Sequence, residues 1–92
     1  TKVLHNILYE DNALRMLEIE VGRNNVFHNQ YPVDINWSRE HGILVLSIIH
    51  QDGSSEFIYS SKSKHRKIQE GDILVVAGYD IELDHFRQKL RG

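Results

Sequence analysis

Apolar and polar residues alternate along the segment from Leu14 to Val21. Glu18 and Glu20 fall on one side of it, and the apolar residues on the other side are Leu17, Ile19 and Val21. Successive side chains of a β-strand point to opposite faces, so a period of two with one polar face is typical of a half-buried strand. The pattern predicts such a strand over residues 14–21.

Two other segments are apolar on both sides and are therefore expected at the centre of a sheet. Ile43 to His50 is rich in β-branched residues, and Ile73 to Ala77 has the same character. Asp52-Gly53 follows the first of them and is a hairpin turn signal. The chain then returns as an alternating strand from Glu56 to Ser60, with Phe57 and Tyr59 on one face.

Two segments have helical spacing of their apolar residues. Val33, Ile35 and Trp37 predict a short helix that ends at His41, where Gly42 can take the left-handed C-cap conformation. A second helix is expected from Ile81 to Leu90, with Asp80 as its N-cap. The residues expected on the buried stripe of this helix are Leu83, Phe86 and Leu90.

The first twelve residues carry an apolar stripe on a very short predicted helix. The stripe consists of Val3, Leu4, Ile7 and Leu8. A helix this short is marginal unless it packs against something. We therefore interpret residues 1–13 as a connector from a preceding domain and residues 14–92 as the domain itself. The predicted fold class is α+β, a small, mostly antiparallel four-stranded sheet with two or three short helices.

Composition narrows the functional classes. The 92 residues suffice for one domain, and the absence of cysteine excludes disulfides and thiolate zinc sites and fits a reducing cytoplasm. Eleven basic against thirteen acidic residues argue against a nucleic-acid partner. The uninterrupted apolar stretches Ile43 to Leu46 and Ile73 to Ala77 are far shorter than the roughly 20 residues of a membrane span. Because the chain begins at Thr1, we expect it to be a piece of a longer protein.

Few residues of the sequence are spaced as catalytic or metal-binding residues usually are. Glu82 and His85 lie one helical turn apart, but a metal site needs three or four ligands and no second pair of this kind exists, so no metal site is expected. No serine lies in a Gly-x-Ser-x-Gly motif, and no enzymatic activity is expected. The basic segment Lys62 to Lys67 has two interpretations: a contact for a phosphate-bearing ligand, or a solvated loop beside a sheet edge.

The second half of the chain carries a more specific pattern. The run from Ile68 to Gly78, IQEGDILVVAG, is followed by a polar step and a final helix. Upstream, Trp37 to Ile48 gives a short helix, a glycine and a central strand. In this order the segments resemble the TrkA C-terminal family, also called RCK-C, a regulatory module of potassium channels and cation transporters. The positions that carry the motif are Gly42, Gly71, Asp72 and Gly78.

The sequence departs from the family between the first strand and the first helix. Asn25-Val26 stands where the family has a small residue followed by proline, and Asn29 stands where it has a glycine. Asn tolerates the left-handed backbone conformation, so that Asn29 can take the place of glycine. The resemblance implies that ligands bind near this region and the central strand. The residues it nominates are Asn25, Phe27, His28, Asn29, Ile43 and Val45.

The resemblance implies a regulatory function. The expected role is a cytoplasmic ligand-sensing domain, at the inner face of the membrane, that couples the binding of a nucleotide, cyclic dinucleotide or cation to the gating of ion transport. The alternative is a ligand-free dimerisation module of a membrane transport protein. Either role predicts a homodimer attached to a membrane-embedded channel or transporter. The apolar residues expected at the dimer contact are the stripe of residues 3–8 together with Tyr31, Pro32 and Trp37.

Overall fold

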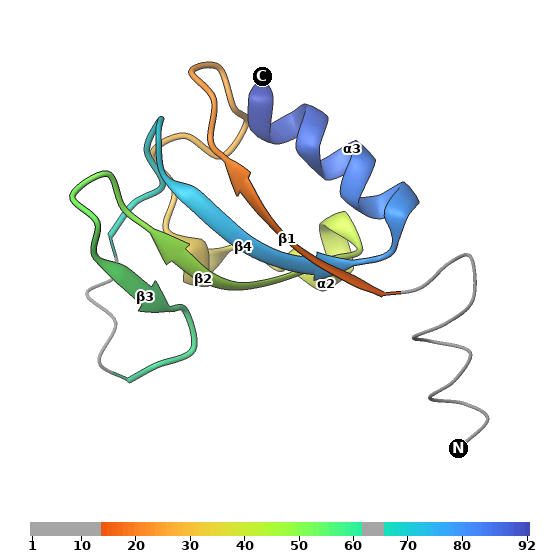
Figure 1. Ribbon diagram of the computed structural model, residues 1–92, viewed down its shortest axis with the longest axis horizontal. Helices are drawn as coiled ribbons and strands as arrows, with labels where there is room; N and C mark the ends of the chain where they lie inside the picture. The colour runs from red at the N-terminus through yellow and green to blue at the C-terminus, as the bar shows by residue number, and fades with distance from the viewer. Residues whose placement is uncertain (1–13, 62–65) are drawn as a thin grey trace.

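Four antiparallel strands form one sheet in the computed structural model, which describes residues 14–61 and 66–92. The strands are β1 (Arg15–Glu20), β2 (Leu44–Ile49), β3 (Ser55–Phe57) and β4 (Ile73–Gly78). Their order across the sheet is β1-β4-β2-β3 (Figure 1). The two segments that are apolar on both sides, β2 and β4, therefore occupy the central positions, which confirms that prediction.

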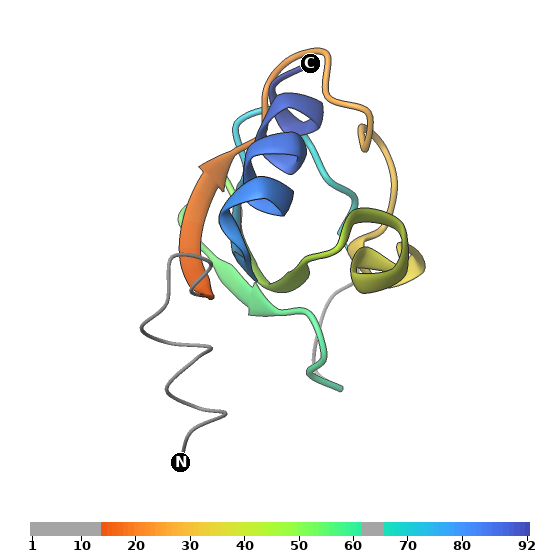
Figure 2. The same cartoon turned by 90° about the vertical axis from the view of Figure 1, so that its right-hand side faces the viewer.

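Both helices cover the same face of the sheet, and the opposite face has no helix of the described residues on it (Figure 2). The helix α3 (Asp80–Arg91) packs on β1 and β4, while α2 (Trp37–His41) packs on β2. The core lies between the sheet and these helices. Its buried members on the strands include Ile19, Val45, Ile48, Leu74 and Val76, and those on α3 are Leu83, Phe86 and Leu90, as the sequence predicts.

An aromatic cluster joins the two helices to the loop that follows β1. The Phe27 ring lies 5.1 Å from the ring of Trp37 and 5.5 Å from that of Phe86, measured between centroids. Trp37 also donates its indole N–H to the backbone oxygen of Pro32, 3.1 Å away. Aromatic pairs at these distances are worth about 0.5–1.5 kcal/mol beyond their buried area. The cluster therefore fixes α2 and the chain before it against α3.

The segment 33–41 is two short elements, where the sequence pattern predicts one helix. A 3-10 turn, η1 (Pro32–Asp34), ends at Ile35, whose backbone is extended, and α2 begins after Asn36. The side-chain oxygen of Asn36 accepts a hydrogen bond from the backbone N–H of Arg39 at 3.3 Å. Asn side chains favour this capping position over a helix interior, which explains why the helix restarts here.

Two smaller expectations also need correction. Asp80 is the first residue of α3, not its cap, and its carboxylate forms an ion pair with the Arg15 guanidinium at 2.6 Å. The third strand ends at Phe57, not at Ser60, because the backbone N–H of Ser60 bonds to the oxygen of Phe57 and closes a turn there. Phe57 and Tyr59 nevertheless contact each other, with ring centroids 5.5 Å apart.

The glycines of the sequence motif lie at the ends of elements, and Gly42 has the predicted C-cap conformation. Gly42 follows α2 in the left-handed conformation (φ +69°), and Gly71 turns the chain into β4 with φ +88°. Gly78 is the last residue of β4. Asp72 is buried, and its carboxylate accepts the backbone N–H of Gln69 at 2.9 Å, which stabilises the turn around Gly71.

Some predictions fall on residues that are not described. The predicted helix over residues 1–12, with the stripe of residues 3–8, lies outside the described part of the chain, and so do Lys62, Lys64 and His65 of the basic segment. Among the residues that are described, no helix is long and apolar enough to cross a membrane.

His41 is a partly buried member of the aromatic cluster. Burial lowers its pKa below the usual 6.5, the nearby Lys89 ammonium lowers it further, and Glu40 opposes the shift. The Lys89 ammonium donates to the Nδ1 atom of His41 at 3.2 Å, which requires that nitrogen to be unprotonated. The neutral ring packs at 5.0 Å from Phe27, edge to face.

Gly71→Val should destabilise the domain. A β-branched residue at positive φ costs about 1–3 kcal/mol, and its side chain would meet the Gln51 amide. We expect the melting temperature to fall by at least about 5 °C in a thermal unfolding scan. Gly71→Asn should lose less, because Asn tolerates this conformation. An unchanged melting temperature for Gly71→Val would refute the role of this turn.

Stability should fall as the pH is lowered below about 6.5. The pKa of His41 is lower in the folded state than in the unfolded chain, so its contribution to stability is complete above the unfolded pKa and is lost as the pH falls through the folded one. Urea unfolding midpoints at pH 7.5 and 5.5 should differ less for His41→Gln than for the wild type. The exposed His28, changed to Gln, is the matched control and should retain the wild-type difference.

Candidate ligand-binding site

The loop after β1 is held by its own hydrogen bonds. Asn25 is buried; its amide donates to the backbone oxygen of Gly22 at 2.8 Å, and its side-chain oxygen accepts the N–H of Phe27 at 2.9 Å. The backbone N–H of Val26 bonds to the oxygen of Lys89 on α3. Both ends of the Asn25 amide are therefore used to shape this loop, which gives Asn25 a structural role.

The six residues nominated by the family resemblance do not form one surface. Phe27, Ile43 and Val45 are core residues, with at most 3% of each exposed. His28 and Asn29 are exposed, and Asn29 has the predicted left-handed backbone with φ +66°. A ligand on the protein surface cannot reach the three core side chains as they are packed, so a surface site must be sought beside them.

A shallow pocket of about 340 Å³ lies between α2 and the start of β2. It contains three exposed apolar side chains, Val33, Leu44 and Tyr59, and the polar side chains of Asn36 and Ser38. The remaining lining residues are Asp34, Ile35 and Trp37. Most small-molecule sites combine apolar walls with a few placed polar groups in this way. We refer to these eight residues as the α2–β2 pocket.

Leu44 was missed by the sequence reasoning, although a signal for it was present. The resemblance nominated Ile43 and Val45, which are buried, whereas 47% of Leu44 between them is exposed. In a strand, neighbours point to opposite faces. Once the face covered by the helices is known, Leu44 must lie on the open one.

A second pocket, of about 640 Å³, lies near the β2–β3 hairpin and is mainly polar. Its deepest group is His50, whose side chain is 1% exposed; the Nε2–H donates to Glu56 at 2.8 Å, and Nδ1 lies 3.7 Å from the Asp72 carboxylate. Every buried polar side-chain atom of the described residues has a hydrogen-bond partner. The His50 group is therefore a satisfied buried network that joins the hairpin to the turn before β4.

The charged side chains described at the rim of this second pocket have partners within the domain. The Ser54 hydroxyl and backbone N–H both bond to Asp52 and lower its pKa to about 2, with a smaller effect of Arg66. The Arg66 guanidinium lies 3.2 Å from the same carboxylate, and the Lys67 ammonium lies over the Tyr31 ring at 5.5 Å. Of the basic segment, Arg66 is thus engaged with the hairpin turn, which favours the solvated-loop interpretation for this residue.

The pair Glu82 and His85 is on α3, away from both pockets. A Cβ atom at Gly42 would meet the Glu82 carboxylate, so that side chain lies against the end of α2. Within residues 14–61 and 66–92 there is no group of three or more His, Cys, Asp or Glu side chains placed to hold a metal ion.

Comparison with known proteins identifies the fold. No family model and no curated protein matches the sequence. Among solved structures, the chain is similar to the RCK C domain of the potassium transport protein KtrA in complex with cyclic diadenosine monophosphate. The TM-score is 0.63 at 21% identity, covering 95% of this chain and 94% of that one.

A second solved structure, described as an RCK domain with cda, gives a TM-score of 0.57. The identity is again 21%, and the match covers 82% of this chain and 96% of the other. Both matches span nearly the whole of the compared domains, and the four-stranded antiparallel sheet with its two helices agrees with them. The resemblance drawn from the sequence is thus confirmed at the level of architecture: this chain has the fold of an RCK C domain.

Proposed function

We propose that this chain is a regulatory domain of potassium or cation transport that binds a cyclic dinucleotide. The observation that carries the proposal is the near-complete structural match to an RCK C domain in complex with cyclic diadenosine monophosphate. In this role the domain lies in the cytoplasm at the inner face of the membrane and acts on a channel or transporter, not as an enzyme. Ligand binding shifts the equilibrium between two arrangements of the assembly, and thereby biases gating.

The α2–β2 pocket is the site we assign to this ligand. Aromatic rings stack on nucleobases, and amide or hydroxyl groups read base edges, so Tyr59, Asn36 and Ser38 have suitable chemistry. Leu44 and Val33 offer apolar walls. Arg39 follows Ser38 on α2 and is exposed, which places a cation on the same short helix for a phosphate group.

The pocket fits one half of the ligand better than the whole. A volume of about 340 Å³ is at the small end of the range for ligand sites. A cyclic dinucleotide has two equal halves, and a homodimer with two-fold symmetry presents the same patch twice. Two chains that face each other across this pocket would therefore enclose one ligand, with each chain contacting one nucleotide.

The dimer contact needs revision from the sequence-based expectation. Pro32 and Trp37 are buried, so they are not available to a partner, whereas Tyr31 is exposed. The exposed apolar residues around the α2–β2 pocket are Val33, Leu44 and Tyr59. We propose this surface as the two-fold contact. The alternative role, a dimerisation module without a ligand, uses the same surface and differs only in ligand response.

A ligand that binds only the folded domain must raise its melting temperature. At one hundred times its dissociation constant the stabilisation is about 2.7 kcal/mol, which for a domain of this size corresponds to a shift of roughly 10 °C or more. We expect cyclic diadenosine monophosphate to give such a shift in a thermal scan, and AMP and divalent cations to give little. No shift with any of these at millimolar concentration would favour the ligand-free module.

Two variants test whether the ligand binds in the α2–β2 pocket or elsewhere on the surface. Leu44→Glu puts a charge in an apolar wall of the pocket, where a bound ligand would cover it without a partner, and should abolish the shift. Val26→Glu is the matched control, because Val26 is similarly exposed but does not line the pocket, and its shift should equal that of the wild type. Equal loss in both variants would contradict the assignment of the site.

The dimer prediction is tested without ligand. Sedimentation velocity should report a dimer at micromolar concentration, and Val33→Glu should convert it to a monomer because a charge is then buried at the contact. Val26→Glu again serves as the control. A wild type that stays monomeric at high concentration would contradict both the dimer and the proposed two-fold ligand site.

A further inference from the structure

The sheet has two edge strands, and one of them is long enough to accept a further strand. The order β1-β4-β2-β3 leaves β1 and β3 at the margins, and among the described residues β1 pairs only with β4. β3 has three residues, whereas β1 has six. A long edge strand presents a row of backbone N–H and C=O groups that can pair with another chain. The outer edge of β1 is therefore the part of the sheet best suited to such pairing.

The register with β4 determines which backbone groups of β1 point outward. In an antiparallel pair, residues that bond to the partner strand alternate with residues whose backbone groups face the other way. Val21 continues the register of β1 with β4 and donates its N–H to the oxygen of Asp72 at 2.7 Å. The odd-numbered residues of β1 therefore bond to β4. The residues whose N–H and C=O groups point to the outer edge are Met16, Glu18 and Glu20.

The last turn of α3 closes this edge at one end. Gly22, the next outward-pointing residue after Glu20, donates its N–H to the oxygen of Leu90 at 2.8 Å. A Cβ atom at Gly22 would clash with the backbone oxygen of Arg91, so this close approach requires glycine. The free edge thus runs from Met16 to Glu20, a length of about 13 Å that suits a partner strand of about five residues.

A pocket of about 310 Å³ lies along the free edge, between β1 and α3. Its charged lining residues are Glu18 and Glu20 on the strand and Arg87 and Arg91 on the helix. All four are exposed, and none of them forms an ion pair within residues 14–61 and 66–92. Two anions and two cations of this pocket are therefore open to a partner.

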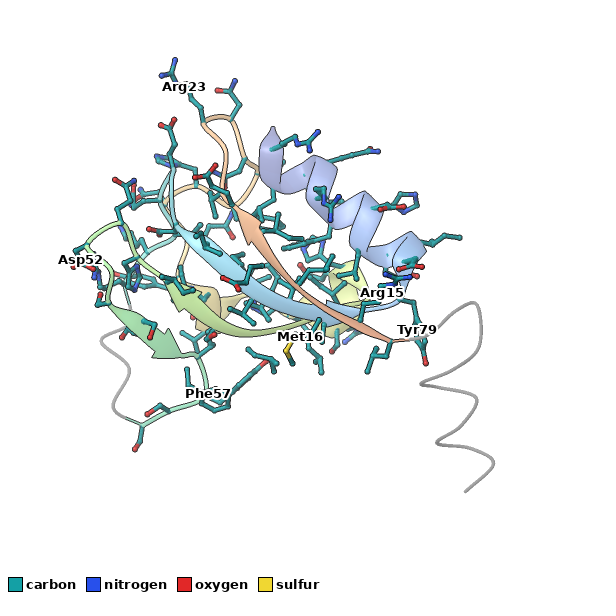
Figure 3. The ribbon with its side chains drawn as sticks, in the orientation of Figure 1. Arg15, Met16, Arg23, Asp52, Phe57 and Tyr79 are labelled. Carbon is teal, nitrogen blue, oxygen red and sulfur yellow. The ribbon has the colours of Figure 1, made fainter. Side chains whose placement is uncertain are left out.

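The acidic and the basic side chains lie on opposite faces of the sheet. Glu18 and Glu20 share the face of Met16, because alternate residues of a strand point the same way. Figure 3 shows Met16 on the side of the strand away from α3. The two arginines belong to α3 and therefore lie on the covered face. A strand added at this edge would place its side chains alternately beside the glutamates and beside the arginines.

A second copy of the chain does not fit this edge. Pairing of β1 with β1 across a two-fold axis puts the glutamates of both copies on one face of the joined sheet, opposite or diagonal to each other. Like charges on neighbouring strands are destabilising, and charged side chains on an edge strand prevent self-association. The occupant that fits is a segment whose own charges alternate, with basic residues on the open face and acidic residues between them on the helix side.

We propose that the outer edge of β1 is a strand-addition site for an extended segment of a partner protein in which basic and acidic residues alternate. The backbone of this segment bonds to Met16, Glu18 and Glu20, its basic side chains contact the two glutamates, and its acidic side chains contact the two arginines. In this mode of recognition the main-chain bonds supply affinity and the alternating side chains supply specificity. The site shares no lining residue with the α2–β2 pocket, so the proposal goes beyond the ligand-sensing role and does not depend on it.

An NMR titration of the isotope-labelled 92-residue chain tests the proposal. The probe is the peptide KEKEV, blocked at both ends, whose lysines lie opposite Glu20 and Glu18 when it pairs antiparallel to β1. We expect saturable shifts of the amide signals of Met16, Glu18 and Glu20, with much smaller changes at Leu17 and Ile19, which bond to β4. The control peptide EKEKV has the same composition with every charge position reversed, and it should bind at least about five-fold more weakly.

A pair of protein variants tests the basic side of the site. Arg87→Gln with Arg91→Gln should weaken the binding of KEKEV several-fold, because the acidic side chains of the peptide lose their partners. Arg39→Gln is the matched control, since Arg39 is an exposed arginine on α2 and does not line this pocket. It should bind the peptide as the wild type does. Equal binding by the double variant and the control would contradict the role of the two arginines.

Four results of the titration would overturn the proposal. The absence of any shift at millimolar peptide would mean that this edge does not accept a strand. Equal affinity for the two peptides would show that the charges do not select the partner. Shifts confined to other residues would place the peptide elsewhere. Shifts of the same three amides on concentrating the chain without peptide would identify a second copy as the occupant. None of these results affects the test of the ligand, which uses the α2–β2 pocket.

Discussion

Both helices of the described chain cover the same face of the four-stranded sheet, and the properties of this domain follow from that arrangement. The covered face holds the core, from Ile19 on the edge strand to Leu74 and Val76 at the centre, and buries it against α3. Burying one such side chain contributes about 1.5–3 kcal/mol. Stability thus comes from one side of the sheet, which leaves the other side and its margins available for contacts.

The aromatic cluster fixes the position of the candidate site relative to the covered face of the sheet. Trp37 belongs both to the cluster and to the wall of the α2–β2 pocket, so the position of the pocket depends on the packing of α2 against Phe27 and Phe86. A ligand or partner chain that displaces α2 must disturb this cluster. Conversely, a well-packed cluster presents the pocket in a defined shape before the ligand arrives, which reduces the ordering cost of binding.

Much of the fold was predictable from sequence because strand patterns and glycine positions are local signals. Alternation at residues 17–21 gave the edge strand, and the two uninterrupted apolar runs gave the central ones. Turns that need positive φ were marked by Gly42 and Gly71, and Asn29 took the same conformation. The break at Asn36 was missed, although Asn is a helix-capping residue, because the apolar spacing of Val33, Ile35 and Trp37 was read as one continuous helix.

The candidate site was less predictable, since it depends on which face of each strand the helices cover. The resemblance nominated Ile43 and Val45 at the start of β2, and the proposed pocket instead uses Leu44 between them, a choice that requires the three-dimensional arrangement. Asn25 shows the same limit: the family resemblance nominated it as a ligand contact, and the structure uses its side chain within the loop. Tyr59 follows β3 in the chain and lines the pocket, but no spacing pattern in the sequence relates it to α2.

The central claim is that two copies of the α2–β2 pocket enclose one cyclic dinucleotide. Isothermal titration calorimetry of the domain with cyclic diadenosine monophosphate tests it most directly, because the stoichiometry reports the symmetry of the complex as well as its affinity. The account predicts saturable binding of one ligand for two chains. Binding of one ligand to each chain, or no heat of binding at concentrations that saturate other cyclic dinucleotide sensors, would contradict it.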